Sequence, residues 1–150
     1  MPWGKSCLKK QKGCCKKMEV TGIDHIGIAV ENLEEASVFY RDALGLQFLG
    51  MEEVPSQKVR VAMFQVGESK IELLEPTASD SPIAVFLEKK GQGIHHIAYS
   101  VTDATGAVSE LVEKEVMMID SQPRPGAGGS RIAFVHPKAS GRVLTELCQH

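Results

Sequence analysis

Alternating apolar and polar positions recur twice along the chain, in two closely similar segments. GIDHIGIAV (residues 22–30) and GIHHIAYSV (residues 93–101) share Gly-Ile-x-His-Ile at an offset of 71 residues. Such alternation is typical of half-buried strands. The first segment places two sets of side chains on opposite faces: Ile23, His25, Gly27 and Ala29 on one, and Asp24, Ile26, Ile28 and Val30 on the other. A duplication of this kind predicts two copies of one structural unit.

Each copy is followed by one helical pattern and three strand-like segments. Asn32 with Glu35 three residues later predicts a helix start and Gly45 its end, while Asp103 is the equivalent N-cap in the second half. The helix residues expected to face inward are Leu33, Ala36, Phe39, Tyr40 and Ala43, then Ala107, Val108, Leu111 and Val112. The expected strands are residues 46–54, 59–66 and 70–75, then 116–121, 131–136 and 143–148.

These patterns predict an α+β fold of two β-α-β-β-β modules, whose mixed sheets curve into a cup. Module one spans residues 19–76 and module two residues 93–149, with a linker helix over residues 81–91 that starts at Ser81 and Pro82. The chain has 150 residues, 43% of them apolar, which suffices for one well-filled core but not for two ordinary domains. Residues 19–150 are therefore expected to form a single domain.

The first 17 residues have a different composition. They contain six lysines, no acid and three of the four cysteines, and without those lysines the formal charge falls from −2 to −8. We expect residues 1–18 to form a basic, disordered extension; a lipidated tether at Cys14 and Cys15 is the alternative. No apolar run approaches the roughly 18 residues of a membrane span, and the overall charge does not indicate a nucleic-acid surface. The sequence thus predicts a cytoplasmic protein with no membrane or nucleic-acid partner.

Four polar side chains recur at corresponding places in the two halves. Each first strand contributes a histidine, His25 or His96, and each last strand contributes a glutamate in an apolar run, Glu72 or Glu146. A carboxylate among leucines and isoleucines is costly to bury unless a cation compensates its charge. One such histidine or glutamate alone would more often be a hydrogen-bonded core residue or a surface residue. The recurrence of both favours a shared metal site.

Two imidazoles and two carboxylates suit one divalent cation with open positions for water or substrate. Co²⁺ or Zn²⁺ is favoured, with Mn²⁺ and Ni²⁺ as alternatives. No organic cofactor is expected, because GAGG at residues 126–129 precedes a strand and is a turn rather than a nucleotide-binding loop. His95 aligns with Asp24 in the repeat, so we expect both on the opposite face, with a structural or outer-sphere role for His95.

These segments resemble the vicinal oxygen chelate superfamily, and residues 80–98, 124–138 and 140–147 resemble the methylmalonyl-CoA epimerases within it. The resemblance covers residues 19–149 and implies His25, Glu72, His96 and Glu146 as the metal ligands. It also implies an acyl-CoA substrate, a homodimer, and epimerisation by α-proton abstraction through a metal-stabilised enolate. Glu146 is the expected acid and base, because a ligand carboxylate can keep one oxygen free near the substrate.

The chain departs from that pattern on one strand. Some epimerases carry a carboxylate base where this chain has Val61, so the second proton carrier is open between Glu52, Glu53 and a water molecule. Arg131 and Lys138 are candidate contacts for the phosphates or carboxylate of the substrate. Two alternative functions stay open: a glyoxalase-type lyase or isomerase on the same metal scaffold, and a metal-free small-molecule binding module. Four protein ligands argue against a ring-cleaving dioxygenase.

Overall fold

The structure is a computed structural model that describes residues 18–150, so the expectations for residues 1–17 lie outside it. Its strands are β1 (Val20–Ala29), β2 (Gln47–Val54), β3 (Val59–Val66), β4 (Ser69–Pro76), β5 (Gly93–Val101), β6 (Arg124–Pro125), β7 (Arg131–Val135) and β8 (Thr145–Gln149). Its helices are α2 (Leu33–Val38), the π-helix η1 (Phe39–Ala43), α3 (Pro82–Lys90) and α4 (Ala104–Glu113), with 3-10 turns η2 (Pro55–Gln57), η3 (Ala127–Gly129) and η4 (Pro137–Ala139). None of the helices in this part of the chain has the length and apolar content needed to span a membrane.

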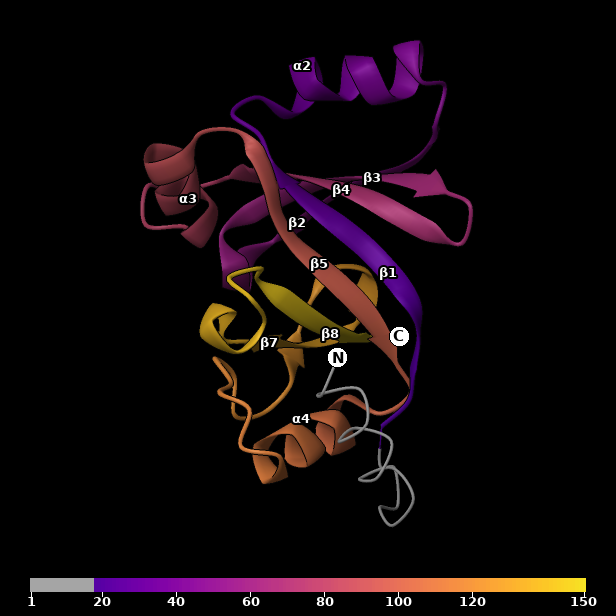
Figure 1. Ribbon diagram of the computed structural model, residues 1–150. Coiled ribbons are helices and arrows are strands. Elements are labelled where there is room, and N and C mark those ends of the chain that lie inside the picture. Colours follow the sequence, from indigo (N-terminus) through magenta and orange to yellow (C-terminus); the bar gives the residue numbers. More distant parts are fainter. Residues whose placement is uncertain (1–17) are drawn as a thin grey trace.

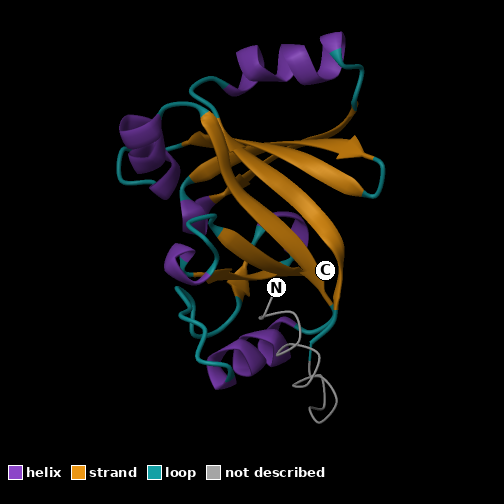
Figure 2. Cartoon of the chain, in the orientation of Figure 1, coloured by secondary structure: helices purple, strands orange, loops and turns teal. Residues whose placement is uncertain are grey.

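The strands form one curved sheet in the order β2-β3-β4-β1-β5-β8-β7-β6 (Figure 1). β1 pairs antiparallel with β5 at the centre, and each is parallel to the last long strand of its own module, β4 or β8. Equivalent strands therefore flank the central pair on both sides. The helices lie around the sheet, with α2 and α4 at opposite ends of the molecule (Figure 2). This arrangement confirms the predicted α+β fold of two β-α-β-β-β modules.

The core of each module directs its glutamate to the inner face of the sheet. Leu73 on β4 is buried in the cluster beneath α2, and Leu147 on β8 is buried with Ala107 of α4. Successive strand residues point to opposite faces. Burying these leucines beneath the helices therefore turns their neighbours, Glu72 and Glu146, away from the helices and into the curve of the sheet.

The linker helix and the strands of module one follow the sequence prediction closely. Ser81 caps α3, because its Oγ accepts a hydrogen bond from Ile83 N at 3.2 Å. Gly91 follows the last helical turn with a φ of 74°, a conformation that favours glycine. The three later strands of module one begin and end within one residue of the predicted limits.

The first helix differs from its prediction in the second half. Asn32 caps it as expected, with Oδ1 accepting from Glu35 N at 2.9 Å. The helix then widens into η1, where Leu44 N donates to Phe39 O, five residues earlier, at 2.9 Å. The wider turn rotates the side chains relative to an α-helix. Phe39 is 54% exposed and Ala43 is also exposed, so the inward orientation predicted for these two residues is wrong.

Module two also departs from its prediction in its helix and over residues 116–121. Val112 is 55% exposed rather than inward-facing. Asp103 occupies the N-cap position of α4 as predicted, but its side chain makes no capping hydrogen bond; the Gln149 side chain accepts from Ala104 N instead, at 2.7 Å. Residues 116–121 form an isolated bridge to β7 rather than a strand. The carboxylate of Asp120 accepts from the backbone N–H of Phe134 at 2.8 Å, so a side chain replaces the ladder bond that a continuous strand would make.

Candidate active site

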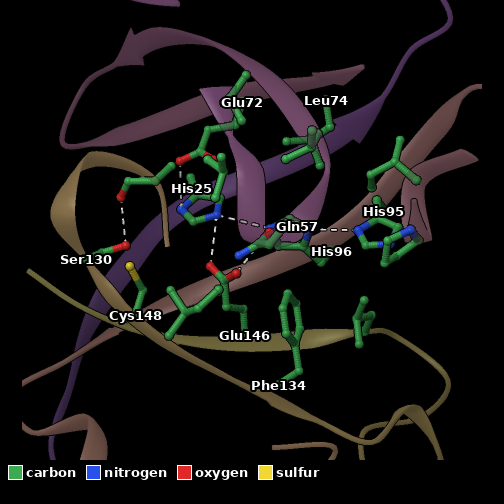
Figure 3. A pocket seen from close by; sticks show the side chains of 18 of the residues that line it. His25, Gln57, Glu72, Leu74, His95, His96, Ser130, Phe134, Glu146 and Cys148 are labelled. Atoms are coloured by element: carbon green, nitrogen blue, oxygen red, sulfur yellow. Dashed lines mark hydrogen bonds and ion pairs between the residues drawn. The ribbon is translucent and has the colours of Figure 1, made fainter. Parts of the chain in front are cut away.

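The inner face of the curved sheet encloses a cavity of about 240 Å³. Most of its wall is apolar and includes Val59, Val61, Leu74, Ile132, Phe134 and Leu144. The four predicted metal ligands line the same cavity and point toward one another (Figure 3). An apolar chamber with a few convergent polar groups is the usual form of a small-molecule site.

The predicted ligands come from the four central strands, and each is at most 6% exposed. His25 Nε2 lies 3.0 Å from His96 Nε2 and 3.0 Å from Glu146 Oε2. His25 Nδ1 lies 3.2 Å from Glu72 Oε2, and His96 Nε2 lies 3.8 Å from Glu146 Oε1. His25 therefore contacts all three of its expected companions, although 121 residues separate His25 from Glu146 in the sequence (25 to 146).

Two small residues, Gly27 and Ala98, each lie between two of the predicted ligands on neighbouring strands. Gly27 pairs with Glu72 on one side and with His96 on the other, and Ala98 pairs with His25 and Glu146 in the same way. A Cβ atom at Gly27 would lie 2.2 Å from Cε1 of His96. The ring of His96 thus lies directly over Gly27, where any larger residue would place a side chain.

The buried charges of the site shift one another's pKa values. Burial opposes a charge on His25, but the hydrogen bond that His25 donates to Asp24 and the neighbouring carboxylates of Glu146 and Glu72 raise its pKa to about 10. Burial raises the pKa of Glu72 to about 7, even though the positive charge of His25 opposes this shift. Burial, together with the charges of His25 and His95, holds the pKa of His96 well below its usual value.

The donor set fits a divalent cation. Within the described part of the chain, Glu146 Oε2 is buried without a well-aligned hydrogen bond, although His25 Nε2 is 3.0 Å away. An unsatisfied buried carboxylate oxygen beside two imidazole nitrogens is chemically suited to a borderline metal ion. Two sets of mutually close ligand atoms share His25: one adds Asp24 and Glu72, the other Glu146 and Cys148. A third set joins Asp24, Cys148 and His150.

Asp24 and His95 do not lie on the opposite face, as strict alternation predicts. The register of the β1–β5 pair shifts at both residues, so that each is an extra residue in its strand. A bulge of this kind redirects the side chain that it carries. Both side chains line the cavity: Asp24 Oδ2 accepts from His25 Nδ1 at 2.7 Å, and His95 Nδ1 lies 2.9 Å from His96 Nδ1. The repeat aligned these two residues correctly but could not reveal the bulges.

The acids considered as a second proton carrier lie away from the cavity. Neither Glu52 nor Glu53 belongs to its lining. Glu52 Oε2 accepts from Gly128 N at 2.8 Å and so ties β2 to the glycine-rich turn, where Gly128 has a φ of 65°. Ala127 of that turn lines the cavity, so the predicted turn forms part of the cavity wall.

The basic residue at the cavity is one that the sequence did not single out. Arg131 donates to Thr105 Oγ1 at 3.1 Å, and neither Arg131 nor Lys138 lines the cavity. Arg124 does line it, with its guanidinium 5.4 Å above the ring of Phe134. The short segment that carries Arg124 has no clear strand or helix pattern, so the sequence offered no signal of its position.

Comparison with known proteins agrees with this geometry. Residues 24–134 match the model of the glyoxalase/bleomycin resistance protein/dioxygenase superfamily. The chain belongs to this superfamily. It is 50% identical over 127 residues to the uncharacterized protein YqjC of Bacillus subtilis (strain 168), a match that covers 85% of this chain and 91% of that protein. It is also 41% identical over 128 residues to the mitochondrial methylmalonyl-CoA epimerase of Mus musculus, covering 85% of this chain and 72% of that protein.

A solved structure extends the likeness to the whole fold. A methylmalonyl-CoA epimerase in complex with methylmalonyl-CoA and NH4⁺ superimposes with a TM-score of 0.84 at 40% identity, covering 87% of this chain and 95% of that one. These relatives confirm the resemblance to the methylmalonyl-CoA epimerases, the glyoxalase-like fold and the enzyme class, an isomerase of the epimerase type. The homodimer and the cytoplasmic location stay predictions.

Proposed function

We propose that the chain interconverts the 2R and 2S forms of methylmalonyl-CoA, with His25, Glu72, His96 and Glu146 holding one divalent cation. The observation that carries this proposal is the meeting of His25 with the other three side chains at 3.0 to 3.2 Å in an apolar cavity. The solved epimerase with methylmalonyl-CoA bound supports the choice of substrate.

Epimerisation needs removal of the α-proton and its return to the opposite face of the same carbon. When bound, a divalent cation supplies Lewis-acid stabilisation of the negative charge that develops on the thioester oxygen. The carboxylate of Glu146 takes the proton, because it lines the cavity and, when it binds the cation through one oxygen, keeps the other oxygen free to accept a proton. This transfer requires the α-carbon of the substrate to lie within hydrogen-bond reach of that oxygen.

The remaining wall of the cavity excludes water and orients the acyl group. Val61, Leu74 and Phe134 present apolar surface around the metal-ligating side chains. Removing water from such a site strengthens the electrostatic interactions inside it. Arg124 is the arginine that can contact the carboxylate or phosphates of the substrate, since its side chain lines the cavity whereas that of Arg131 does not; the Nε of Arg124 also lies 3.3 Å from Asp120 Oδ1.

The second proton carrier is to be sought among the groups that line the cavity. Val61 contributes an apolar side chain to the lining and offers no carboxylate. The carboxylates of the lining are Asp24, Glu72 and Glu146. Glu52 and Glu53 lie outside it, so substitution of either to glutamine should leave the rate unchanged.

Deuterium exchange tests the proposed reaction. The Co²⁺-loaded protein is incubated with (2R)-methylmalonyl-CoA in deuterated water, and the mass and α-proton signal of the substrate are followed. We expect one deuterium per molecule together with conversion to the 2S form. Absence of exchange would contradict the proposal. Turnover of the hemithioacetal of methylglyoxal and glutathione would indicate the glyoxalase-type alternative, and binding of methylmalonyl-CoA without exchange would indicate a binding module.

A further inference from the structure

Two of the three register shifts in the central strand pair, those at Asp24 and His95, occupy equivalent positions in the duplicated modules. Asp24 and His95 are separated by the same 71 residues as His25 and His96 (24 to 95 and 25 to 96). Each bulge residue directly precedes a predicted ligand histidine on its strand. Each contacts the Nδ1 atom of that histidine, at 2.7 Å for Asp24 and at 2.9 Å for His95.

These contacts decide which ring nitrogen is left to face the centre of the site. A neutral imidazole carries its proton on one nitrogen and can bind a metal only through the other. The carboxylate of Asp24 has no proton to donate when ionised, so it holds the proton on Nδ1 of His25 and leaves the lone pair on Nε2. Glu72 Oε2 also lies near His25 Nδ1, at 3.2 Å, but Asp24 is closer by half an ångström.

The same reasoning applies to the second module. His95 and His96 meet through their two Nδ1 atoms, so one of them donates and the other accepts. Where His95 accepts, the Nε2 of His96 carries the free lone pair. In both modules the Nε2 atom therefore faces the centre of the predicted metal site, and the Nε2 atoms of His25 and His96 lie 3.0 Å apart.

We propose that Asp24 and His95 are a duplicated pair of positioning residues that fix the tautomer and ring orientation of His25 and His96 for metal binding through Nε2. This inference rests on the proposed metal function. Partners of ligand histidines commonly set the tautomer and ring angle in this way. Here the β-bulges provide the pair, because an uninterrupted strand would turn both side chains to the other face.

Further contacts hold each positioning residue in place. Asp24 Oδ1 lies 2.9 Å from His150 Nε2, which anchors the carboxylate on the side away from His25. The ring of His95 packs edge-on against Phe86 of the linker helix, with ring centroids 5.0 Å apart. The two positioning residues differ in charge. The ionised carboxylate of Asp24 is a stronger hydrogen-bond acceptor than the neutral imidazole of His95. We therefore expect substitution of Asp24 to weaken metal binding more than substitution of His95.

Zinc affinity tests the proposal without relying on turnover. Competition with a chromophoric chelator gives the Zn²⁺ affinity of wild type, Asp24→Leu and His95→Leu. We expect losses of about 10- to 100-fold, the usual effect of removing such a partner. Asp24→Asn and His95→Asn keep an oxygen near the same position that can accept from Nδ1, so both should recover most of the affinity. Glu110→Gln, at a buried acid on α4 outside the cavity, is the matched control and should bind Zn²⁺ as wild type does.

Imidazole nitrogen shifts in the wild-type protein give a second readout that needs no variant to fold. In the ¹⁵N-labelled, Zn²⁺-loaded protein we expect a protonated Nδ1 and a metal-shifted Nε2 for both histidines. Wild-type affinity in both leucine variants, or metal-shifted Nδ1 atoms, would overturn the inference while leaving the proposed function intact. Failure of the wild-type protein to bind Zn²⁺ or Co²⁺ would instead overturn the metal function itself, and the inference with it.

Discussion

His25 Nε2 and His96 Nε2 lie 3.0 Å apart, although the two residues are 71 positions apart in the sequence. The antiparallel pairing of β1 and β5 causes this approach, because it brings equivalent positions of the two modules to the same point of the sheet. Two imidazole nitrogens at this distance need a proton or a cation between them. The buried glutamates beside them favour the cation.

Replacing Glu146 by glutamine should separate catalysis from folding. The amide keeps the size of the side chain but cannot take a proton, so we expect the rate of α-deuterium exchange to fall by about 10²- to 10⁴-fold. Thermal unfolding should shift little, because a buried charge is removed along with its contacts. Exchange at the wild-type rate would remove Glu146 from the mechanism.

Gly27→Ala should disturb the site through His96. The new methyl group would lie 2.2 Å from Cε1 of that ring, which must move away. We expect a Co²⁺ affinity at least 10-fold lower, comparable to the loss of an outer-sphere partner, as measured by chelator competition. Gly22→Ala on the same strand is the matched control, since a methyl group there meets no atom within 4 Å. Equal affinity in both variants would show that the ring tolerates the methyl group.

The metal-free protein should lose stability as the pH rises. The pKa of His25 is raised to about 10 in the folded protein. Protonated His25 therefore contributes fully to the free energy of unfolding below the ordinary histidine pKa of 6.5, and this contribution is lost as the pH rises through 10. The pKa of Glu72 is also raised, to about 7. Stability therefore also falls as the pH rises from 4.5 to 7, because in that range the folded protein binds more protons than the unfolded chain.

Thermal unfolding in the presence of a chelator measures this dependence. We expect the melting temperature to fall between pH 7 and pH 10 in the wild-type protein and to change less in His25→Gln. At pH 7, metal binding should release more than one proton, because His25 is protonated and Glu72 is partly so in the metal-free state. Calorimetry in buffers of different ionisation enthalpy counts those protons, and a count of zero would contradict the assignment of His25 and Glu72 as ligands.

Arg124→Gln should weaken substrate binding more than turnover. Arg124 is the basic side chain of the cavity wall, so its loss should raise KM for methylmalonyl-CoA by about 10-fold, as expected for one charge-assisted hydrogen bond, with little change in kcat. Arg131→Gln is the matched control, because Arg131 lies outside the cavity lining and contacts Thr105. An equal effect of both substitutions would indicate general electrostatic attraction rather than a specific contact.

The duplication in the sequence contained most of the information about the site. Gly-Ile-x-His-Ile and the apolar runs around Glu72 and Glu146 predicted the residues that meet in the cavity, because two related modules repeat the same strand positions. The sequence missed features that break regular geometry. Two bulges, one on each central strand, move Asp24 and His95 into the cavity, and a π-helical turn exposes Phe39. Strict periods of 2.0 and 3.6 residues cannot describe an inserted residue.

The amount of Co²⁺ bound by each chain tests the central claim most directly. Elemental analysis of the wild-type protein after loading with Co²⁺ and removal of free metal should give one ion per chain. The single substitutions His25→Ala, Glu72→Ala, His96→Ala and Glu146→Ala should each give a ratio well below one. A wild-type protein that retains no Co²⁺, or four variants that all retain one ion, would contradict a shared metal site.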